Sequence, residues 1–416
     1  MWITTLLFVF MGCTEDPIIL PSYTPRVLPD LCADTTQELK PLWKFPLRLD
    51  TGRTIVGDIV SVDKDVVIYT DENVYRIDGK TGQSKWLWSI PDLEAKAGAD
   101  YSMFRKDNLF LINGRTINYC LDVNSGKLVR QTDKNPNNRI GHPRFTLIGN
   151  SMYQEFVNRE NTYTDSVKYL QRADINTCKW EDIFLLRKKD HDDYDYGLAE
   201  PPALFLKNTG DSVLMFKYRS FKASQTWTRL FFYAYNINQR KVEWRIDSLD
   251  YDGSIHPAIV EKDRVFVEGW GSIYCIDANT GVIIWTRYCN GRFPGGSNLV
   301  SYKDRLAAVT LDGRFVCINK TTGEFIYNYK DDYNGRFDIA SPQNAEVLNG
   351  VMYVCGGGFL YGIDLDTGNI IGKYETPNRC KKSDAIFGYG NLVVNEQQNC
   401  IYLDDEYFLM CFKAFK

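Results

Sequence analysis

The sequence has little of several features that define common protein classes. Only 3 of its 416 residues are histidine, so a histidine-rich metal site has few ligands to draw on. Lys and Arg number 49 against 53 Asp and Glu, and the net charge of −4 argues against a general nucleic-acid binder. No apolar run reaches the ~20 residues that a membrane-spanning helix needs. We therefore predict no metal site, no cofactor and no nucleic-acid partner.

The composition favours a folded, sheet-rich protein. Apolar residues make up 44% and charged residues 25%, close to globular averages. Phe, Trp and Tyr together reach 14%, and aromatic side chains are enriched in strands. The length allows one large repeat domain or two to three ordinary domains.

The first 13 residues resemble a bacterial lipoprotein signal. The apolar stretch from Ile3 to Met11 has the length of a signal-peptide core. It ends in Phe10-Met11-Gly12-Cys13, similar to a lipobox, in which a small residue precedes the lipidated cysteine. No Lys or Arg precedes the run, and Phe10 stands where Leu is usual. We expect a signal peptide over residues 1–12 and lipidation of Cys13; a plain secretory signal is the alternative.

Residues 13–40 are predicted to be a tether between membrane and folded body. The segment after Cys13 is rich in proline and has no hydrophobic period, which is typical of an extended linker. Glu15-Asp16 resembles a surface-export signal of some lipoproteins. The expected location is the bacterial cell envelope, most simply the outer membrane on its periplasmic or surface face, with attachment through lipid only.

One pattern recurs along the rest of the chain: an apolar strand, an Asp or Asn, a Gly four residues later, and a second strand. It appears, for example, as VYRIDGKTGQSKWLW from Val74 and IYCIDANTGVIIW from Ile273. The Asp or Asn, here called the anchor, occurs at Asp78, Asp122, Asp174, Asn236, Asp277, Asn319 and Asp364, with a degenerate eighth copy at Lys413. Seven shared copies predict a repeat architecture.

Each repeat reads as a four-stranded antiparallel unit. The anchor side chain bonds its own backbone in a turn, and the glycine supplies a positive φ. A second hairpin precedes each pattern, and the spacing of 40 to 50 residues is that of a propeller blade. We predict an all-β fold over residues 41–416: an eight-bladed β-propeller with four-stranded antiparallel blades. The segment Pro41 to Leu47 is expected to supply the outer strand of the last blade and close the ring.

The repeats resemble those of pyrroloquinoline-quinone-type propellers, in which a Trp packs between neighbouring blades. Three copies carry Trp eight residues after the anchor, at Trp86, Trp244 and Trp285. The resemblance implies that these side chains dock one blade on the next. It covers roughly Pro41 to Lys416.

Two branches of that group imply different functions. Its dehydrogenases carry an adjacent Cys-Cys pair, a calcium site of Glu, Asn and Asp, and a catalytic Asp, whereas this chain has no adjacent cysteines and no haem-attachment motif. The non-catalytic branch includes the propeller lipoprotein of the outer-membrane β-barrel assembly machinery, whose layout of lipid, tether and propeller this chain resembles. We expect a non-catalytic binding or scaffold module for an envelope protein or peptide, including a larger membrane complex. A quinone-dependent periplasmic dehydrogenase and a surface glycan binder are the alternatives.

The cysteines are interpreted as mainly buried. Four of them, Cys120, Cys275, Cys317 and Cys411, stand two residues before an anchor, a repeated place that favours small core side chains. Cys32, Cys289, Cys380 and Cys400 are left as candidates for pairing in an oxidising compartment.

The candidate binding face lies at the mouth of the central channel. The connections that enter the innermost strands carry Arg and His residues, which a ring would gather together: Arg53, Arg139, His142, His256, Arg292 and Arg336. Clustered guanidinium groups favour a carboxylate or phosphate ligand, or an acidic peptide; the alternative is a set of solvated turns. Two long loops on the same face add possible partner contacts at Tyr163, Phe221 and Trp227.

Overall fold

The computed structural model describes most of the predicted propeller. The described residues are 39–47, 56–70, 72–91, 103–113, 117–132, 139–158, 167–177, 179–187, 195–198, 202–221, 228–251, 257–290, 299–310, 313–330, 345–356, 359–377, 387 and 391–416. The predicted signal peptide, Cys13 and the tether up to residue 38 lie outside them. Within the described residues every regular element is a strand, and no helix that could cross a membrane is found.

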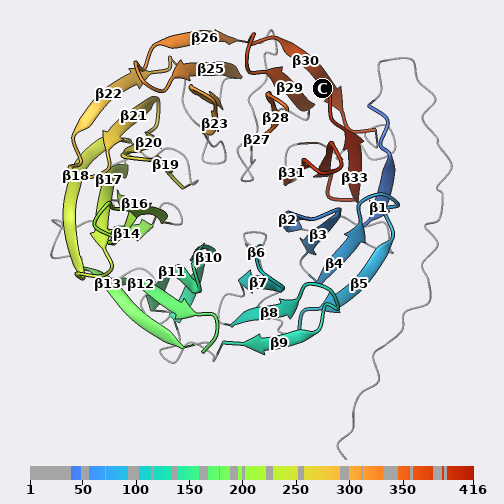
Figure 1. Ribbon diagram of the computed structural model, residues 1–416, viewed down its shortest axis with the longest axis horizontal. Coiled ribbons are helices and arrows are strands. Elements are labelled where there is room, and N and C mark those ends of the chain that lie inside the picture. Colours follow the sequence, from blue (N-terminus) through green and yellow to red (C-terminus); the bar gives the residue numbers. More distant parts are fainter. Residues whose placement is uncertain are drawn as a thin grey trace, which may run out of the picture.

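Eight sheets stand around a ring, as predicted (Figure 1). Seven contain four antiparallel strands, in chain order in six of them, and one contains a fifth strand. We number the blades in chain order, from blade 1 (residues 56–89) to blade 8 (residues 392–413 with residues 43–46). The innermost strands face the centre of the ring, and the outermost strands form its circumference (Figure 1).

The strands fall into four concentric layers. The innermost are β2 (Val56–Val62), β6 (Met103–Lys106), β10 (Arg139–Ile148), β14 (Asp195–Leu198), β15 (Ala203–Leu206), β19 (Ile259–Glu261), β23 (Val300–Tyr302), β27 (Glu346–Leu348) and β31 (Leu392–Asn395). The second are β3 (Asp65–Thr70), β7 (Leu109–Asn113), β11 (Ser151–Asn158), β16 (Ser212–Phe221), β20 (Arg264–Glu268), β24 (Arg305–Val309), β28 (Val351–Gly356) and β32 (Cys400–Asp404). The third are β4 (Asn73–Asp78), β8 (Asn118–Asp122), β12 (Val167–Asp174), β17 (Thr228–Asn236), β21 (Ser272–Asp277), β25 (Arg314–Asn319), β29 (Phe359–Asp364) and β33 (Phe408–Lys413). The outermost are β5 (Ser84–Ser89), β9 (Leu128–Gln131), β13 (Trp180–Arg187), β18 (Lys241–Tyr251), β22 (Ile283–Tyr288), β26 (Phe325–Lys330), β30 (Ile370–Glu375) and β1 (Trp43–Pro46).

Every anchor ends the third strand of its blade. In blade 1 the Asp78 carboxylate accepts hydrogen bonds from the backbone N–H of Lys80 (3.0 Å) and Thr81 (2.9 Å). The N–H of Gly82 donates to the Asp78 carbonyl at 2.8 Å, and Gly82 has a φ of +71°. The repeat found in the sequence is therefore the turn between the third and fourth strands.

The ring closes through the N-terminal strand, as predicted. Strand β1 pairs antiparallel with β33, with Trp43 opposite Cys411 and Pro46 opposite Phe408. The last blade thus combines three strands from the end of the propeller with one from its start. This closure leaves β33 without an open edge.

Blade 4 departs from the predicted four strands. Its innermost layer is split, because β14 and β15 both pair with β16, at opposite ends of that ten-residue strand. Pro201 and Pro202 stand between the two pieces in the sequence. Proline cannot donate to a strand ladder, so a continuous inner strand is interrupted there.

The apolar core lies between blades. One cluster joins Val67 and Tyr69 of blade 1 to Phe110 and Ile112 of blade 2, all buried. Similar clusters join the other pairs of neighbouring blades. The strand faces that carry alternate apolar residues are therefore buried against the next blade rather than in one central core.

The described cysteines belong to these interfaces. The four that precede an anchor by two residues are buried, as predicted, and so are Cys289, Cys355 and Cys400, all with free thiols. Burial raises the pKa of Cys289 to about 12 and that of Cys275 to about 11. Thiols held protonated in this way are poor nucleophiles. Cys32, Cys178 and Cys380 lie outside the described residues.

Candidate functional site

The strand register defines one face of the ring, which we call the loop face. Arg139, the first residue of β10, lies opposite Asn158, the last residue of β11. Asp195, the first residue of β14, likewise lies opposite Phe221, the last residue of β16. The starts of these innermost strands and the ends of the second strands therefore share a face, where the sequence predicts the binding site.

The structure describes only part of the predicted binding set. Arg139 and His142 lie in β10, and Phe221 ends β16, but only their backbone is described. The other predicted members lie outside the described residues: Arg53, Tyr163, Trp227, His256, Arg292 and Arg336. The arginine cluster therefore stays a prediction.

Two carboxylates on innermost strands were not singled out from the sequence. Burial, with the negative charge of Asp58 as a second cause, raises the pKa of Glu346 to about 7. Glu346 begins β27 in blade 7 and Asp58 lies in β2 of blade 1, on either side of β31 in blade 8. Asp58 accepts hydrogen bonds at 2.8 Å from the N–H groups of Ile59 and Met103. Only the tertiary structure brings the two groups near enough to interact.

The opposite face, which we call the turn face, carries the anchors and is occupied by contacts between blades. The indole rings of Trp86, Trp244 and Trp285 each cover the turn glycine of the next blade. A Cβ built on Gly126, Gly281 or Gly323 would lie 2.6 to 2.7 Å from the ring above it. Each indole N–H donates to a backbone carbonyl of the same turn, at 3.0 to 3.1 Å.

The acceptor in each of these turns is the carbonyl one residue after the anchor. Those carbonyls belong to Val123, Ala278 and Lys320. Arginines reach the same place in other seams: Arg130 donates to Ile175 at 3.0 Å, and Arg305 donates to Leu365 at 2.6 Å. The position after the anchor is thus a shared docking acceptor around the ring.

The docking position is filled in other ways in blades 2, 7 and 8. Arg130, eight residues after Asp122, replaces Trp in blade 2. In blade 8 the closing strand supplies Trp43, whose N–H donates to the Gly79 carbonyl at 2.7 Å. In blade 7 the position is Gly372, and the ring of Phe415 from blade 8 lies 2.4 Å from a Cβ placed there. The direction of insertion is therefore reversed between blades 7 and 8.

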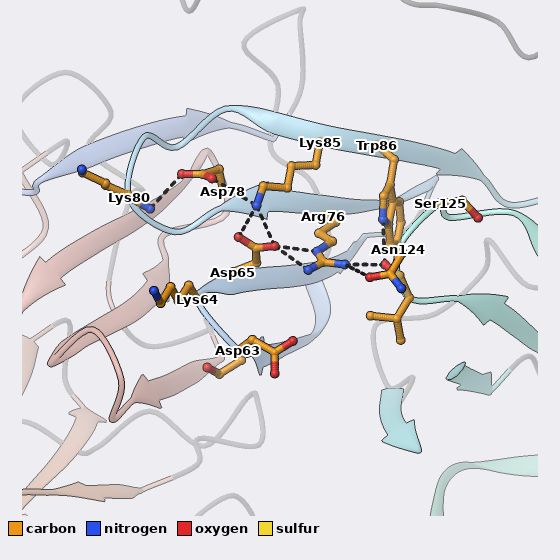
Figure 2. Close-up of polar contacts among 12 residues, drawn as sticks. Asp63, Lys64, Asp65, Arg76, Asp78, Lys80, Lys85, Trp86, Asn124 and Ser125 are labelled. Atoms are coloured by element: carbon orange, nitrogen blue, oxygen red, sulfur yellow. Dashed lines mark hydrogen bonds and ion pairs between the residues drawn. The ribbon is translucent and has the colours of Figure 1, made fainter. Parts of the chain in front are cut away.

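The seam between blades 1 and 2 contains a buried ionic network (Figure 2). Asp65, whose side chain is 4% exposed, accepts from Arg76 Nε and from Lys85 Nζ, each at 2.7 Å. Arg76 continues across the seam and donates to the Val123 carbonyl at 2.7 Å. The hydrogen bond to Asp65 is the main cause that raises the pKa of Lys85. A buried charge with partners on both sides fixes the relative position of the two blades.

Within the described residues, no cluster of the usual metal ligands is found. Nowhere among them do three or more His, Cys, Asp or Glu side chains gather as metal ligands would. Glu346 and Asp58 are two carboxylates, and burial favours the protonated form of the first. No two cysteines of the chain are adjacent, so the disulfide ring expected of the quinone-dependent branch has no counterpart.

The blade pattern, docking tryptophans and ring closure resemble those of pyrroloquinoline-quinone-type propellers. The family model described as outer membrane protein assembly factor BamB matches residues 232–401, which run from blade 4 to blade 8. The chain resembles that family over this range. A search of curated proteins gives no match.

Three solved structures show the same fold. A europium-containing methanol dehydrogenase is 12% identical, with a TM-score of 0.58 over 88% of this chain and 84% of that one. The computationally designed Ika8 protein is 11% identical, with a TM-score of 0.57 over 87% and 97%. Sqt1 of Saccharomyces cerevisiae is 10% identical, with a TM-score of 0.57 over 89% and 98%. At such identities the likeness concerns the fold alone.

Proposed function

We propose that this chain is a non-catalytic lipoprotein of the cell envelope whose propeller binds a protein or peptide partner. The observation that carries the proposal is the match of residues 232–401 to a family described as an outer-membrane assembly factor. The predicted signal peptide and lipidation at Cys13 agree with that compartment. A scaffold role within a larger membrane complex is consistent with that description.

The geometry supports the loop face as the binding face. On the turn face, the carbonyls that follow the anchors accept hydrogen bonds from the neighbouring blade and are thus used within the ring. The loop face carries the ends of β11 and β16, from which the longest connections between a second and a third strand leave, residues 159–166 and 222–227. Loops held on a rigid scaffold are the usual place for partner recognition.

The predicted arginines indicate which kind of ligand the site would bind. Guanidinium groups gathered at a channel mouth bind carboxylates in a bidentate manner, so an acidic segment of the partner is the expected ligand. Loss of one charge-assisted contact costs about 1.5–3 kcal/mol, or roughly tenfold or more in affinity.

The test compares the wild-type chain with the Arg139→Ala, Arg336→Ala double variant. Partners are captured by cross-linking in envelopes and identified by mass spectrometry, and capture is expected to fall at least tenfold in the double variant. Arg105→Ala is the matched control, because Arg105 pairs with Asp63 at the turn face. Equal capture by all three proteins contradicts the arginine site. A quinone absorbance band after reconstitution would instead favour a dehydrogenase.

A further inference from the structure

The outermost strand of blade 5 is unusually apolar for an exposed edge. Val282, just before β22, is 62% exposed, and Ile283 and Ile284 are 40% and 45% exposed. Tyr288 at the end of the strand is 64% exposed. Within the described residues β22 pairs only with β21, so its outer edge lies on the circumference of the ring (Figure 1). Its backbone can accept another strand there.

At the start of the outer strand, the other blades carry charges that blade 5 lacks. Natural edge strands avoid pairing with other chains by placing charges on the edge. We compare the segment that lies five to nine residues after the anchor in each blade. Seven of the eight blades hold at least one charged residue there. These are Lys85; Lys127 and Arg130; Lys179, Glu181 and Asp182; Lys241, Glu243 and Arg245; Glu324; Lys373; and, by register in blade 8, Lys40 and Lys44. The corresponding segment of blade 5, VIIWT from Val282 to Thr286, holds none.

The neighbouring outer strands extend this apolar surface. Val242 of blade 4 is 38% exposed and Ile326 of blade 6 is 40% exposed. Both lie near the start of their strands, as Ile283 and Ile284 do in β22. Strands β18, β22 and β26 follow one another around the circumference (Figure 1).

We propose that β22 is a pairing edge for a second copy of this chain, joined antiparallel across a two-fold axis. An occupant must be extended, apolar and free of opposing charge, and β22 of a second molecule meets all three conditions. The only charged residue of β22 is Arg287, whose guanidinium already donates to the Gly323 carbonyl of blade 6. Pairing Ile284 with Tyr288 of the partner would place β-branched and aromatic side chains opposite each other, a favourable cross-strand pair.

The expected dimer is weak and reversible. The strand has six residues, and at about 3.3 Å per residue its edge is about 20 Å long. So short an edge buries less than the roughly 1,200 Å² typical of stable interfaces, which places it among transient contacts. The two blades would form one continuous sheet of eight strands. This inference concerns the outer edge and goes beyond the binding proposed for the loop face.

Sedimentation velocity on the full chain, from about 1 μM to about 100 μM, tests the dimer. The wild type is expected to shift from monomer to dimer, and Ile284→Lys to weaken association at least tenfold. Ile326→Lys is the matched control, because Ile326 holds the same repeat position in the next blade. Any association caused by the lipid anchor would be the same in both variants. A monomer throughout, or equal weakening by both variants, overturns the proposal. A monomer would leave a strand of a different protein as the occupant.

Hydrogen exchange separates strand pairing from general stickiness. Backbone N–H groups on the outer edge of β22 gain a partner only if the strands pair. Their exchange is therefore expected to slow at least tenfold at high protein concentration in the wild type and in Ile326→Lys, but not in Ile284→Lys. Exchange that is independent of concentration in the wild type overturns the proposal.

Discussion

At the residue scale, the docking position depends on a pair of residues: a large side chain in one blade and a glycine in the next. Trp244 covers Gly281 so closely that a Cβ there would lie 2.7 Å from the indole. Gly281 also has a φ of +75°, which other residues adopt only with strain. The glycine is therefore required twice, by the turn and by the ring above it.

Replacing Gly281 with Ala tests which requirement matters more. A positive φ costs a non-glycine residue about 1–2 kcal/mol, and forcing a methyl into a packed site adds about 1–3 kcal/mol. Gly149→Ala is the control, because Gly149 has a φ of +60° and nothing within 4 Å of an added Cβ. Urea unfolding should show Gly281→Ala losing more free energy of unfolding than Gly149→Ala, by at least about 1 kcal/mol. Equal losses would mean that the indole moves aside.

The sequence points to part of this docking rule. The spacing of Trp86, Trp244 and Trp285 from their anchors is visible in the repeat. Arg130 occupies the same place, but without a tertiary structure an arginine on an outer strand reads as a solvated side chain. Phe415 follows no repeat spacing at all; the signal that was available is the glycine at position 372, where the other blades carry larger side chains.

At the scale of elements, closure of the ring depends on β1, which is not joined to its partner strand β33 by a short turn. Strand β22 follows β21 through a five-residue turn, whereas β1 pairs with β33 from the other end of the propeller. A short turn keeps a detached strand at high effective concentration, and a distant segment lacks that advantage. Packing of Trp43 and Phe45 in the cluster between blades 8 and 1 must hold β1 in place.

Substitution of Trp43 by Ala should therefore loosen the ring locally. Loss of a buried Trp costs about 3–5 kcal/mol, and we expect amides of β33 that face β1 to exchange at least tenfold faster. Trp285→Ala is the control, because it removes the same side chain from β22 while the turn to β21 remains. Hydrogen exchange followed by mass spectrometry makes the measurement. Equal protection of β33 in both variants would show that pairing alone holds β1.

Blade 4 shows where the repeat pattern fails to predict an element. Its anchor lies 62 residues after that of blade 3, and the extra length was visible in the sequence. That the innermost strand would divide into β14 and β15 was not predicted, because both pieces pair with one long strand and only register shows this. Insertions change the local pairing while the anchor turn stays in place.

At the scale of the molecule, the ring brings like charges together. Glu346 and Asp58 come from blades 7 and 1, which lie far apart in the sequence and close in the ring. Burial raises the pKa of Glu346 from 4.5 to about 7, with the Asp58 charge adding to it. The unfolded chain releases this proton at lower pH than the folded chain. Stability is therefore favoured at low pH and falls as pH rises from about 4.5 through 7.

The variant Glu346→Gln should remove this dependence. A shift from 4.5 to about 7 corresponds to about 3 kcal/mol, so the variant is expected to be more stable than the wild type by up to that amount at pH 8. The two should differ least near pH 4. Urea unfolding at several pH values measures the difference, and the effect of Asp404, whose pKa burial raises to about 8, cancels between them. A difference that does not grow with pH would contradict the assignment.

The sequence by itself determined the repeat, the blade count and the closing strand. Turn chemistry and strand alternation are local, so each copy of the repeat can be recognised from its own residues. Eight copies and one additional N-terminal strand fit a single ring. Only the tertiary structure decided which side chains meet across a seam, that Phe415 replaces a docking indole, that Glu346 and Asp58 come near enough to interact, and that the apolar residues of β22 are exposed beside those of its neighbours. These depend on the distance between blades, and no spacing along the chain encodes it.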